Sequence, residues 1–283
     1  YPDPEDSLIS GLRQVPPWSF AVIDESGERI HRYWTPARSG EIRDREHAVA
    51  SVRASLEESC SNLLLSDVPV GLMLSSGIDS ALIALLLRNH SIPAYTARFG
   101  DASFDEGFGA EQIAAEAGHS WHPITADGAA GIARDFEAVA VAADGELADS
   151  SALAHYAVCR ALRAEVTVAL AGDGADEFFG GYDTYAATRV AGTAGRLVPQ
   201  ALARLAAQRL TALSARREDR LPTSAMLARL FAGLAAPDGT PHAEWRRLTG
   251  ADLLKDLYTA PMREVAEQDP LTRYRAAFLA AEG

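Results

Sequence analysis

Two short loops of small and acidic residues are the places in this sequence where chemistry could occur. The first runs from Ser75 to Ser80 and reads Ser-Ser-Gly-Ile-Asp-Ser. The second runs from Gly172 to Glu177 and reads Gly-Asp-Gly-Ala-Asp-Glu. Each follows an apolar run typical of a buried strand, 68–74 or 166–170, and each leads into a helical pattern. Such positions support phosphate binding at a helix N-terminus and metal binding by carboxylates.

The first loop has the composition of a phosphate-binding turn. A helix N-terminus leaves backbone N–H groups unpaired and carries partial positive charge, which attracts anions. Gly77 permits unusual backbone angles, and the serine hydroxyls add donors. Asp79 alone would repel phosphate, so its presence predicts a Mg²⁺ ion that bridges carboxylate and phosphate. A plain N-cap is the simpler explanation for any single serine or aspartate of the loop.

The second loop places three carboxylates, those of Asp173, Asp176 and Glu177, within five residues. Like charges this close are costly unless a cation lies among them. The helix dipole explains Asp176 and Glu177, which fall in the first turn of the next helix, but it leaves Asp173 unexplained. In a doubly wound sheet both loops lie at the carboxyl edge, where ligands bind, so we predict Mg-nucleotide chemistry. The first loop is neither a Walker A loop nor a dinucleotide fingerprint.

The elements that must position these loops alternate between strands and helices. Strand patterns occur at 68–74, 94–99, 119–124 and 166–170, and helical patterns at 44–64, 81–87, 113–117, 129–141 and 151–163. This alternation predicts an α/β fold with a parallel, Rossmann-like sheet. Asp44 is the expected N-cap of the first helix, and Gly118 is the expected end of the third.

Three regions follow from this pattern. Residues 1–43 form an extended N-terminal segment in which 19–34 is expected to make a hairpin, because a turn signal separates two strand patterns. Residues 44–190 form the α/β core. Residues 191–283 are rich in Ala, Leu and Arg with helical spacing, which predicts a helical subdomain.

Composition and charge exclude several classes of protein. The 283 residues include 26 basic and 39 acidic side chains, a net charge of −13, so we expect no general affinity for nucleic acid or an anionic membrane. Cys60 and Cys159 are too few for a disulfide scaffold, and they predict a reducing, cytoplasmic compartment. The longest apolar stretch, 81–87, is too short to span a membrane. The chain begins with Tyr1, so we expect a processed or trimmed piece.

The two loops also resemble known motifs. Residues 75–80 resemble the SGGxDS pyrophosphate loop of the N-type ATP pyrophosphatases, whose core belongs to the adenine nucleotide alpha hydrolase-like fold. The string Ala169–Tyr182 resembles the more specific LSGDGADELFGGY signature of the glutamine-dependent asparagine synthetase family. Asp67–Gly71, Phe104–Glu106 and Asp149–Ala152 resemble further segments of that family. The resemblance covers residues 44 to about 190 well.

This resemblance implies an ATP-dependent carbon–nitrogen ligase. Such an enzyme activates a carboxylic acid with Mg-ATP, forms an acyl-adenylate, releases pyrophosphate and AMP, and joins the acyl group to an amine. The implied catalytic residues are Asp173, Asp79 and Asp176, and the implied metal ligands are Asp79 and Asp176. The implied nucleotide contacts are Met73, Ser75, Ser76, Gly77, Asp79, Ser80, Ala97, Ala171 and Gly172. The implied partners are a small carboxylic acid, either aspartate or a natural-product acid, and a glutaminase domain or subunit that supplies ammonia.

The sequence departs from the family pattern at three positions. Ser76 replaces a glycine of the first loop, Ala171 replaces a serine, and Arg98 stands where the family often has glycine. No cysteine matches the N-terminal nucleophile of the family's glutaminase, so we expect no glutaminase activity from this chain. Lys255, the only lysine, lacks the context of the family's downstream lysine-bearing segment, so the helical subdomain is expected to be incomplete.

Several functions remain open from the sequence. The first is asparagine synthetase-like amide formation, and a related alternative is a synthetase that closes β-lactam or macrolactam rings. A nucleotide-binding pseudoenzyme without the catalytic lysine segment is an alternative of a different class. The oligomeric state is open. His119 and His122 lack an evident third ligand, which favours a structural or site-edge role over a metal site.

Overall fold

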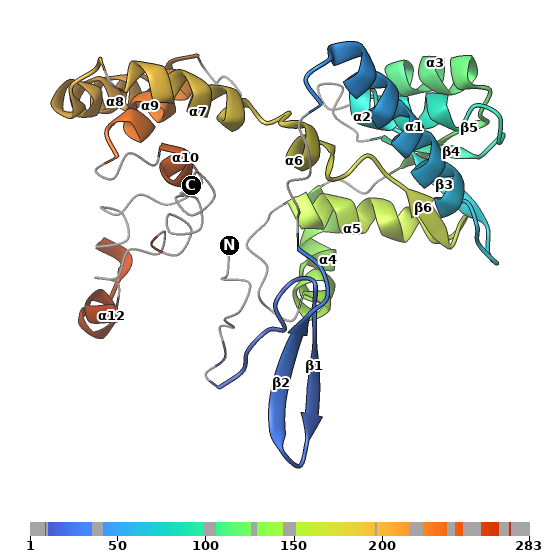
Figure 1. Cartoon of the computed structure of the whole chain (residues 1–283), viewed down its shortest axis with the longest axis horizontal. Coiled ribbons are helices and arrows are strands. Elements are labelled where there is room, and N and C mark those ends of the chain that lie inside the picture. Colours follow the sequence, from blue (N-terminus) through green and yellow to red (C-terminus); the bar gives the residue numbers. More distant parts are fainter. Residues whose placement is uncertain are drawn as a thin grey trace. The chain divides into compact units, whose positions relative to one another are not determined.

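Residues 1–173 and residues 174–283 form two separate units of the structure. The computed structural model (Figure 1) describes residues 9, 11–35, 42–98, 106–125, 129–143, 151–195, 197–214, 223–236, 241–245, 256–265 and 272. Five residues named in the sequence analysis lie outside these described ranges: Phe104, Asp105, Asp149, Ser150 and Lys255.

The predicted hairpin near the N-terminus is confirmed. Strand β1 (Ser19–Asp24) pairs antiparallel with β2 (Gly27–Arg32). The turn is closed by Asp24, whose carboxylate accepts a hydrogen bond from the Ser26 backbone N–H at 2.8 Å. The pKa of Asp24 is lowered to about 2, mainly by hydrogen bonds from Arg29 and to a lesser degree by those from Ser26. This carboxylate therefore stays ionised and keeps its turn contacts at neutral pH.

Four parallel strands form the central sheet, which confirms the predicted α/β class. They are β3 (Val70–Met73), β4 (Ala94–Arg98), β5 (Trp121–Thr125) and β6 (Val168–Leu170), in the order β5-β4-β3-β6. All three neighbouring pairs are parallel. Within this sheet, β3 comes first along the chain, and β4 and β5 follow on one side of it. Strand β6 comes last and lies on the other side of β3. The direction of winding therefore reverses between β3 and β6.

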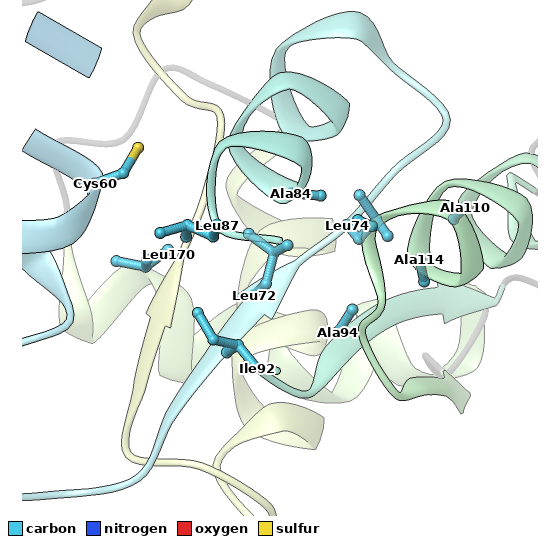
Figure 2. Close-up of a cluster of buried hydrophobic side chains, with 11 residues drawn as sticks. Cys60, Leu72, Leu74, Ala84, Leu87, Ile92, Ala94, Ala110, Ala114 and Leu170 are labelled. Carbon is cyan, nitrogen blue, oxygen red and sulfur yellow. The ribbon is translucent and has the colours of Figure 1, made fainter. Parts of the chain in front are cut away.

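Helices cover both faces of this sheet (Figure 1). The first-unit helices are α1 (Arg45–Leu63), α2 (Ile78–Leu86), α3 (Gly107–Ala117), α4 (Ala129–Ala142) and α5 (Ser151–Leu162). Alternate residues of a strand point to opposite faces, and the two buried clusters follow this rule. One cluster contains Leu72, Ala94 and Leu170 together with side chains of α1, α2 and α3 (Figure 2). The other contains Tyr95, Met73 and Ala169 together with side chains of α5.

The predicted helix ends are also confirmed. The Asp44 side chain accepts a hydrogen bond from the His47 backbone N–H at 2.7 Å, which caps α1. Gly118 follows α3 with φ of +77°, a left-handed backbone conformation that favours glycine. These caps fix where the sheet-covering helices begin and end.

His119 has a structural role in the first unit. Its ring is buried, with Nδ1 accepting a hydrogen bond from the Ile92 N–H at 3.2 Å and Nε2 lying 2.8 Å from the Ala84 carbonyl oxygen. The ring therefore joins α2 and the segment before β4 to the end of α3. By contrast, His122 is exposed and stacks on Tyr95.

We expect His119→Ala to lower the free energy of unfolding by about 2–4 kcal/mol, because two buried backbone groups lose their partner. Urea denaturation of the full chain measures this change. His90→Ala is the matched control, since His90 is exposed and lies in the neighbouring connection. Equal stability of the His119 and His90 variants would contradict the structural role.

Within its described part the second unit contains helices and no strand. These helices are α6 (Ala175–Phe179), α7 (Asp183–Ala194), α8 (Gln200–Ser214), α9 (Thr223–Leu234), α10 (Pro241–Trp245) and α12 (Ala260–Val265). The Trp245 indole N–H donates to the Arg229 carbonyl at 2.7 Å and joins α10 to α9. Among the described residues of both units, no helix has the length and apolar character needed to cross a membrane.

Candidate active site

The first loop and the start of the second meet where the winding of the sheet reverses. Residues 75–80 follow β3 and residues 171–173 follow β6, and these two strands are parallel neighbours. A crevice outside the carboxyl ends of strands at such a reversal is the usual ligand site of an open α/β sheet. A Cβ atom on Gly172 would lie 2.9 Å from the Ser80 nitrogen and 3.1 Å from the Asp79 Cβ. The backbone of Gly172 therefore contacts the first loop directly.

Two serine side chains hold the first loop in its folded shape. The buried Ser80 hydroxyl accepts a hydrogen bond from the Ser75 N–H at 3.1 Å and lies 2.8 Å from the Ser75 Oγ. The Ser75 Oγ in turn accepts a hydrogen bond from the Gly77 N–H at 3.1 Å. These hydroxyls, which we expected to act as donors to phosphate, organise the turn from inside.

A pocket of about 440 Å³ opens at this edge of the sheet, within the range of about 300–1,000 Å³ typical of small-molecule sites. All of its described lining residues belong to the first unit. The lining residues are Met73, Leu74, Ser75, Gly77, Asp79, Ser80, Tyr95, Thr96, Ala97, Glu106, His155, Val158, Ala171, Gly172 and Asp173. The pocket thus combines side chains from both loops with side chains from β4 and α5.

The pocket brings together all predicted site residues except Ser76 and Asp176. Ser76 is exposed, and its backbone N–H donates to the Glu106 carboxylate at 3.1 Å. Asp176 belongs to the second unit, in the first turn of α6. The role of each of these residues remains a prediction.

The loop that contains Asp176 is shaped by glycines. Gly174 precedes α6 with φ of +90°, and Gly180 ends it with φ of +70°. A Cβ atom on Gly181 would collide with the Asp176 carboxylate, so this glycine leaves space for that side chain. Glu177, the third carboxylate of the motif, accepts a hydrogen bond from the Tyr182 hydroxyl at 2.7 Å. The positive φ of Gly174 and Gly180 thus favours glycine there, and Gly181 leaves space for the Asp176 carboxylate.

Several side chains that line the pocket were not predicted as site residues from the sequence. Glu106 appeared only as part of a family-like segment, and His155 and Val158 of α5 had no assigned role. Thr96 is buried and accepts a hydrogen bond from the Trp121 indole N–H at 3.0 Å. Only the resemblance of 149–152 to a family segment signalled that the start of α5 lies near the site.

The negative charge of Asp173 affects the pKa of a thiol on α5. The pKa of the Cys159 thiol is raised, first by partial desolvation of the sulfur and second by the negative charge of Asp173. On the same helix, Arg160 forms an ion pair with the buried Asp135 of α4. The pKa of Asp135 is lowered despite its burial, mainly by hydrogen bonds from Arg134 and to a lesser degree by those from Arg160. This ion pair fixes α5, which forms one wall of the pocket.

Two of the departures from the family pattern lie against the start of α3. A Cβ atom on Gly109 would lie only 2.8 Å from the Ser76 Cβ. A Cβ atom on Gly107 would lie 2.7 Å from Cδ and Nε of Arg98. Both glycines therefore provide the room that Ser76 and Arg98 require.

We expect Gly109→Ala to weaken binding of Mg-ATP about tenfold, because overpacking of this kind costs ~1–3 kcal/mol and would displace the first loop. The double variant Ser76→Gly with Gly109→Ala should recover most of the affinity, since it removes the colliding Cβ. Calorimetric titration of the four chains of this cycle gives the coupling between the two positions. An equal loss in the single Gly109→Ala chain and in the double variant would show that the contact is unimportant.

Comparison with known proteins shows to which family this chain belongs. Residues 51–279 match the profile of the asparagine synthase family. The chain belongs to the asparagine synthase family. Its match to that family includes both loops and all described residues of the pocket.

Individual proteins from other organisms align with part of this chain. Asparagine synthetase (glutamine-hydrolyzing) 1 of Bacillus subtilis is 31% identical over 188 residues, which is 64% of this chain and 29% of that protein. Asparagine synthetase (glutamine-hydrolyzing) 3 of the same organism is 27% identical over 197 residues, or 63% of this chain and 32% of that protein. Amidase chyE of Penicillium rubens is 31% identical over 206 residues, or 64% and 30%. The chain therefore spans about a third or less of the length of these relatives.

Proposed function

We propose that this chain carries the synthetase site of an ATP-dependent, AMP-forming carbon–nitrogen ligase. The observation that carries the proposal is the pocket shared by the Ser75–Ser80 loop, Ala97, and Asp173 after β6. A pyrophosphate-binding loop beside a carboxylate is the arrangement needed to hold a nucleoside triphosphate and bring an acid to its α-phosphorus. The acid would form an acyl-adenylate with release of pyrophosphate, and an amine would then displace AMP.

Each part of the pocket has a role in this proposal. Backbone N–H groups of the first loop would hold the leaving pyrophosphate, and Met73 and Ala97 would contact the nucleoside. Ala171 and Gly172 would close the other side of the triphosphate. Asp173 would act where the adenylate forms. This chemistry depends on positioning and charge neutralisation more than on covalent participation by the protein.

The donor set of the pocket fits Mg²⁺. Asp79 and Asp173 offer carboxylate oxygens beside the phosphate loop, and Mg²⁺ is commonly held by one or two carboxylates together with substrate phosphates and water. No group of three or more acidic, histidine or cysteine side chains set to hold a metal occurs in the described part of the chain. Asp79 would hold the ion in this pocket, and the ion would neutralise charge as pyrophosphate leaves. That Asp176 is a further metal ligand stays a prediction from the family resemblance.

The proposal also covers the acid that is activated and the source of the nitrogen. The names of the Bacillus relatives favour aspartate as the acid and ammonia released by glutamine hydrolysis as the amine, supplied by a glutaminase domain or subunit. A natural-product acid, such as a β-lactam or macrolactam precursor, is the alternative. The free thiols of Cys60 and Cys159 are consistent with a cytoplasmic location, which we include in the proposal.

Isotope exchange between pyrophosphate and ATP, driven by a panel of acids, tests the proposed function. We expect exchange that depends on Mg²⁺ and on one acid of the panel, with aspartate and macrolactam or β-lactam precursors as the main candidates. Binding of ATP without exchange for any acid would indicate the pseudoenzyme alternative. Absence of ATP binding would refute the proposal.

A further inference from the structure

The carboxylate of Glu106 is bonded to the loop that is expected to receive phosphate. Its Oε2 accepts a hydrogen bond from the Ser76 backbone N–H at 3.1 Å. Glu106 immediately precedes α3 and lies 30 residues from Ser76 in the chain. It also lines the pocket together with Asp79 and Asp173. An acidic side chain from another element therefore already occupies one donor of the first loop.

The Ser76 amide differs in this respect from the amides on either side of it. The Ser75 N–H donates to the Ser80 hydroxyl, and the Gly77 N–H donates to the Ser75 hydroxyl, so both are satisfied inside the loop. The Ser76 N–H instead donates to an anion that is not part of the loop. Phosphate oxygens and carboxylate oxygens are equivalent acceptors for such a donor. A bound pyrophosphate group can therefore take this amide only by displacing Glu106.

The start of α3 holds Glu106 in this position. Gly109, on the first turn of α3, approaches Ser76 closely, and Gly107 lies against the Arg98 side chain at the end of β4. The first contact places the first turn of α3 directly against the first loop, and the second places it against the end of β4. The Glu106 carboxylate, although exposed, is thus presented to the Ser76 amide by packed backbone.

The charge on Glu106 affects free and metal-bound polyphosphate differently. A metal-free polyphosphate would meet the carboxylates of Glu106, Asp79 and Asp173 in one pocket, and like charges at short range repel. A divalent cation on the polyphosphate cancels much of this repulsion. We propose that Glu106 is a specificity residue that makes the pocket select metal-bound over metal-free polyphosphate, by holding the Ser76 amide until a neutralised pyrophosphate group displaces it. This inference rests on the proposed function.

Binding of inorganic pyrophosphate, measured by calorimetry with Mg²⁺ and with EDTA, tests the inference on the full chain. In Glu106→Gln we expect the metal-free Kd to fall about tenfold, since the competing charged hydrogen bond and a repulsive charge are both lost. The Kd with Mg²⁺ should change less than threefold, so the preference for the metal-bound form shrinks. Glu106→Ala, which removes the acceptor altogether, should show the same loss of preference.

Glu111→Gln is the matched control, because Glu111 is an exposed carboxylate of the same helix and is not among the lining residues. It should leave both affinities unchanged. If both Glu106 variants keep the preference of the unmodified chain for metal-bound pyrophosphate, the inference is wrong and the proposed function stands. If Mg-pyrophosphate binding is lost in the variants, Glu106 assists the metal-bound form and the displacement is refuted. An unmodified chain that binds neither pyrophosphate nor ATP would overturn the proposed function and this inference together.

Discussion

Asp79→Asn will lower acid-dependent pyrophosphate exchange by about 10²–10³-fold, the usual loss when one charge-stabilising group is removed from a reaction centre. Asp79 lies in the first turn of α2 and lines the pocket beside Gly172. Its carboxylate belongs to the loop expected to hold phosphate, where only a cation makes a negative charge favourable. Asparagine keeps the size of the side chain and removes the charge.

The fold should survive this change. Asparagine is nearly isosteric with aspartate, and Asp79 lies at a helix N-terminus, where an amide side chain is tolerated. Asp67→Asn is the matched control, since Asp67 is exposed and is not among the lining residues of the pocket. Circular dichroism and exchange rates of both variants separate folding from catalysis. Exchange within threefold of the unmodified rate in Asp79→Asn would exclude Asp79 from the reaction centre.

Gly172→Ala will weaken Mg-ATP binding at least about tenfold, because the added methyl group costs strain of ~1–3 kcal/mol at the contact between the two loops. The new Cβ would lie 2.9 Å from the Ser80 nitrogen and 3.2 Å from the Asp79 carbonyl carbon. Both are backbone atoms at the start of α2, so neither can move aside by a side-chain rotation. The loops must separate, and the triphosphate site opens.

Gly192→Ala is the control for the Gly172 variant. A Cβ on Gly192 meets no atom within 4 Å, and this residue lies inside α7, where alanine is a better helix former. Calorimetric titration with Mg-ATP should therefore give an unchanged Kd for Gly192→Ala. A folded Gly172→Ala chain with unchanged affinity would show that contact between the loops is not needed for binding.

Local pattern was sufficient to predict most of the elements around the site. The strand before Ser75 and the strand before Ala171 are short apolar runs, and the helix ends at Asp44 and Gly118 carry strong cap signals. Periodicity is a property of neighbours in the chain, so it is visible in a single sequence. The helix before Gly118 begins earlier than its apolar pattern indicated, because two glycines and an exposed Phe108 open it.

The contacts that shape the pocket were not visible in the sequence. The hydrogen bond from Ser76 to Glu106 joins residues 30 apart, and the position of His155 depends on how α5 packs on the sheet. Such contacts depend on strand order, which the pattern of a single chain does not encode. The inward role of Ser80 was missed for a similar reason, since the sequence indicates a donor without showing which acceptor it meets.

A titration of the labelled full chain with Mg²⁺ and a non-hydrolysable ATP analogue, followed by amide resonances, tests the shared triphosphate site most directly. Amides of the Ser75–Ser80 loop and those of Gly172 and Asp173 should shift together, with one saturation midpoint. The amides of the β1–β2 hairpin should not shift. Saturable binding that moves only one of the two loops, or neither of them, would contradict the account.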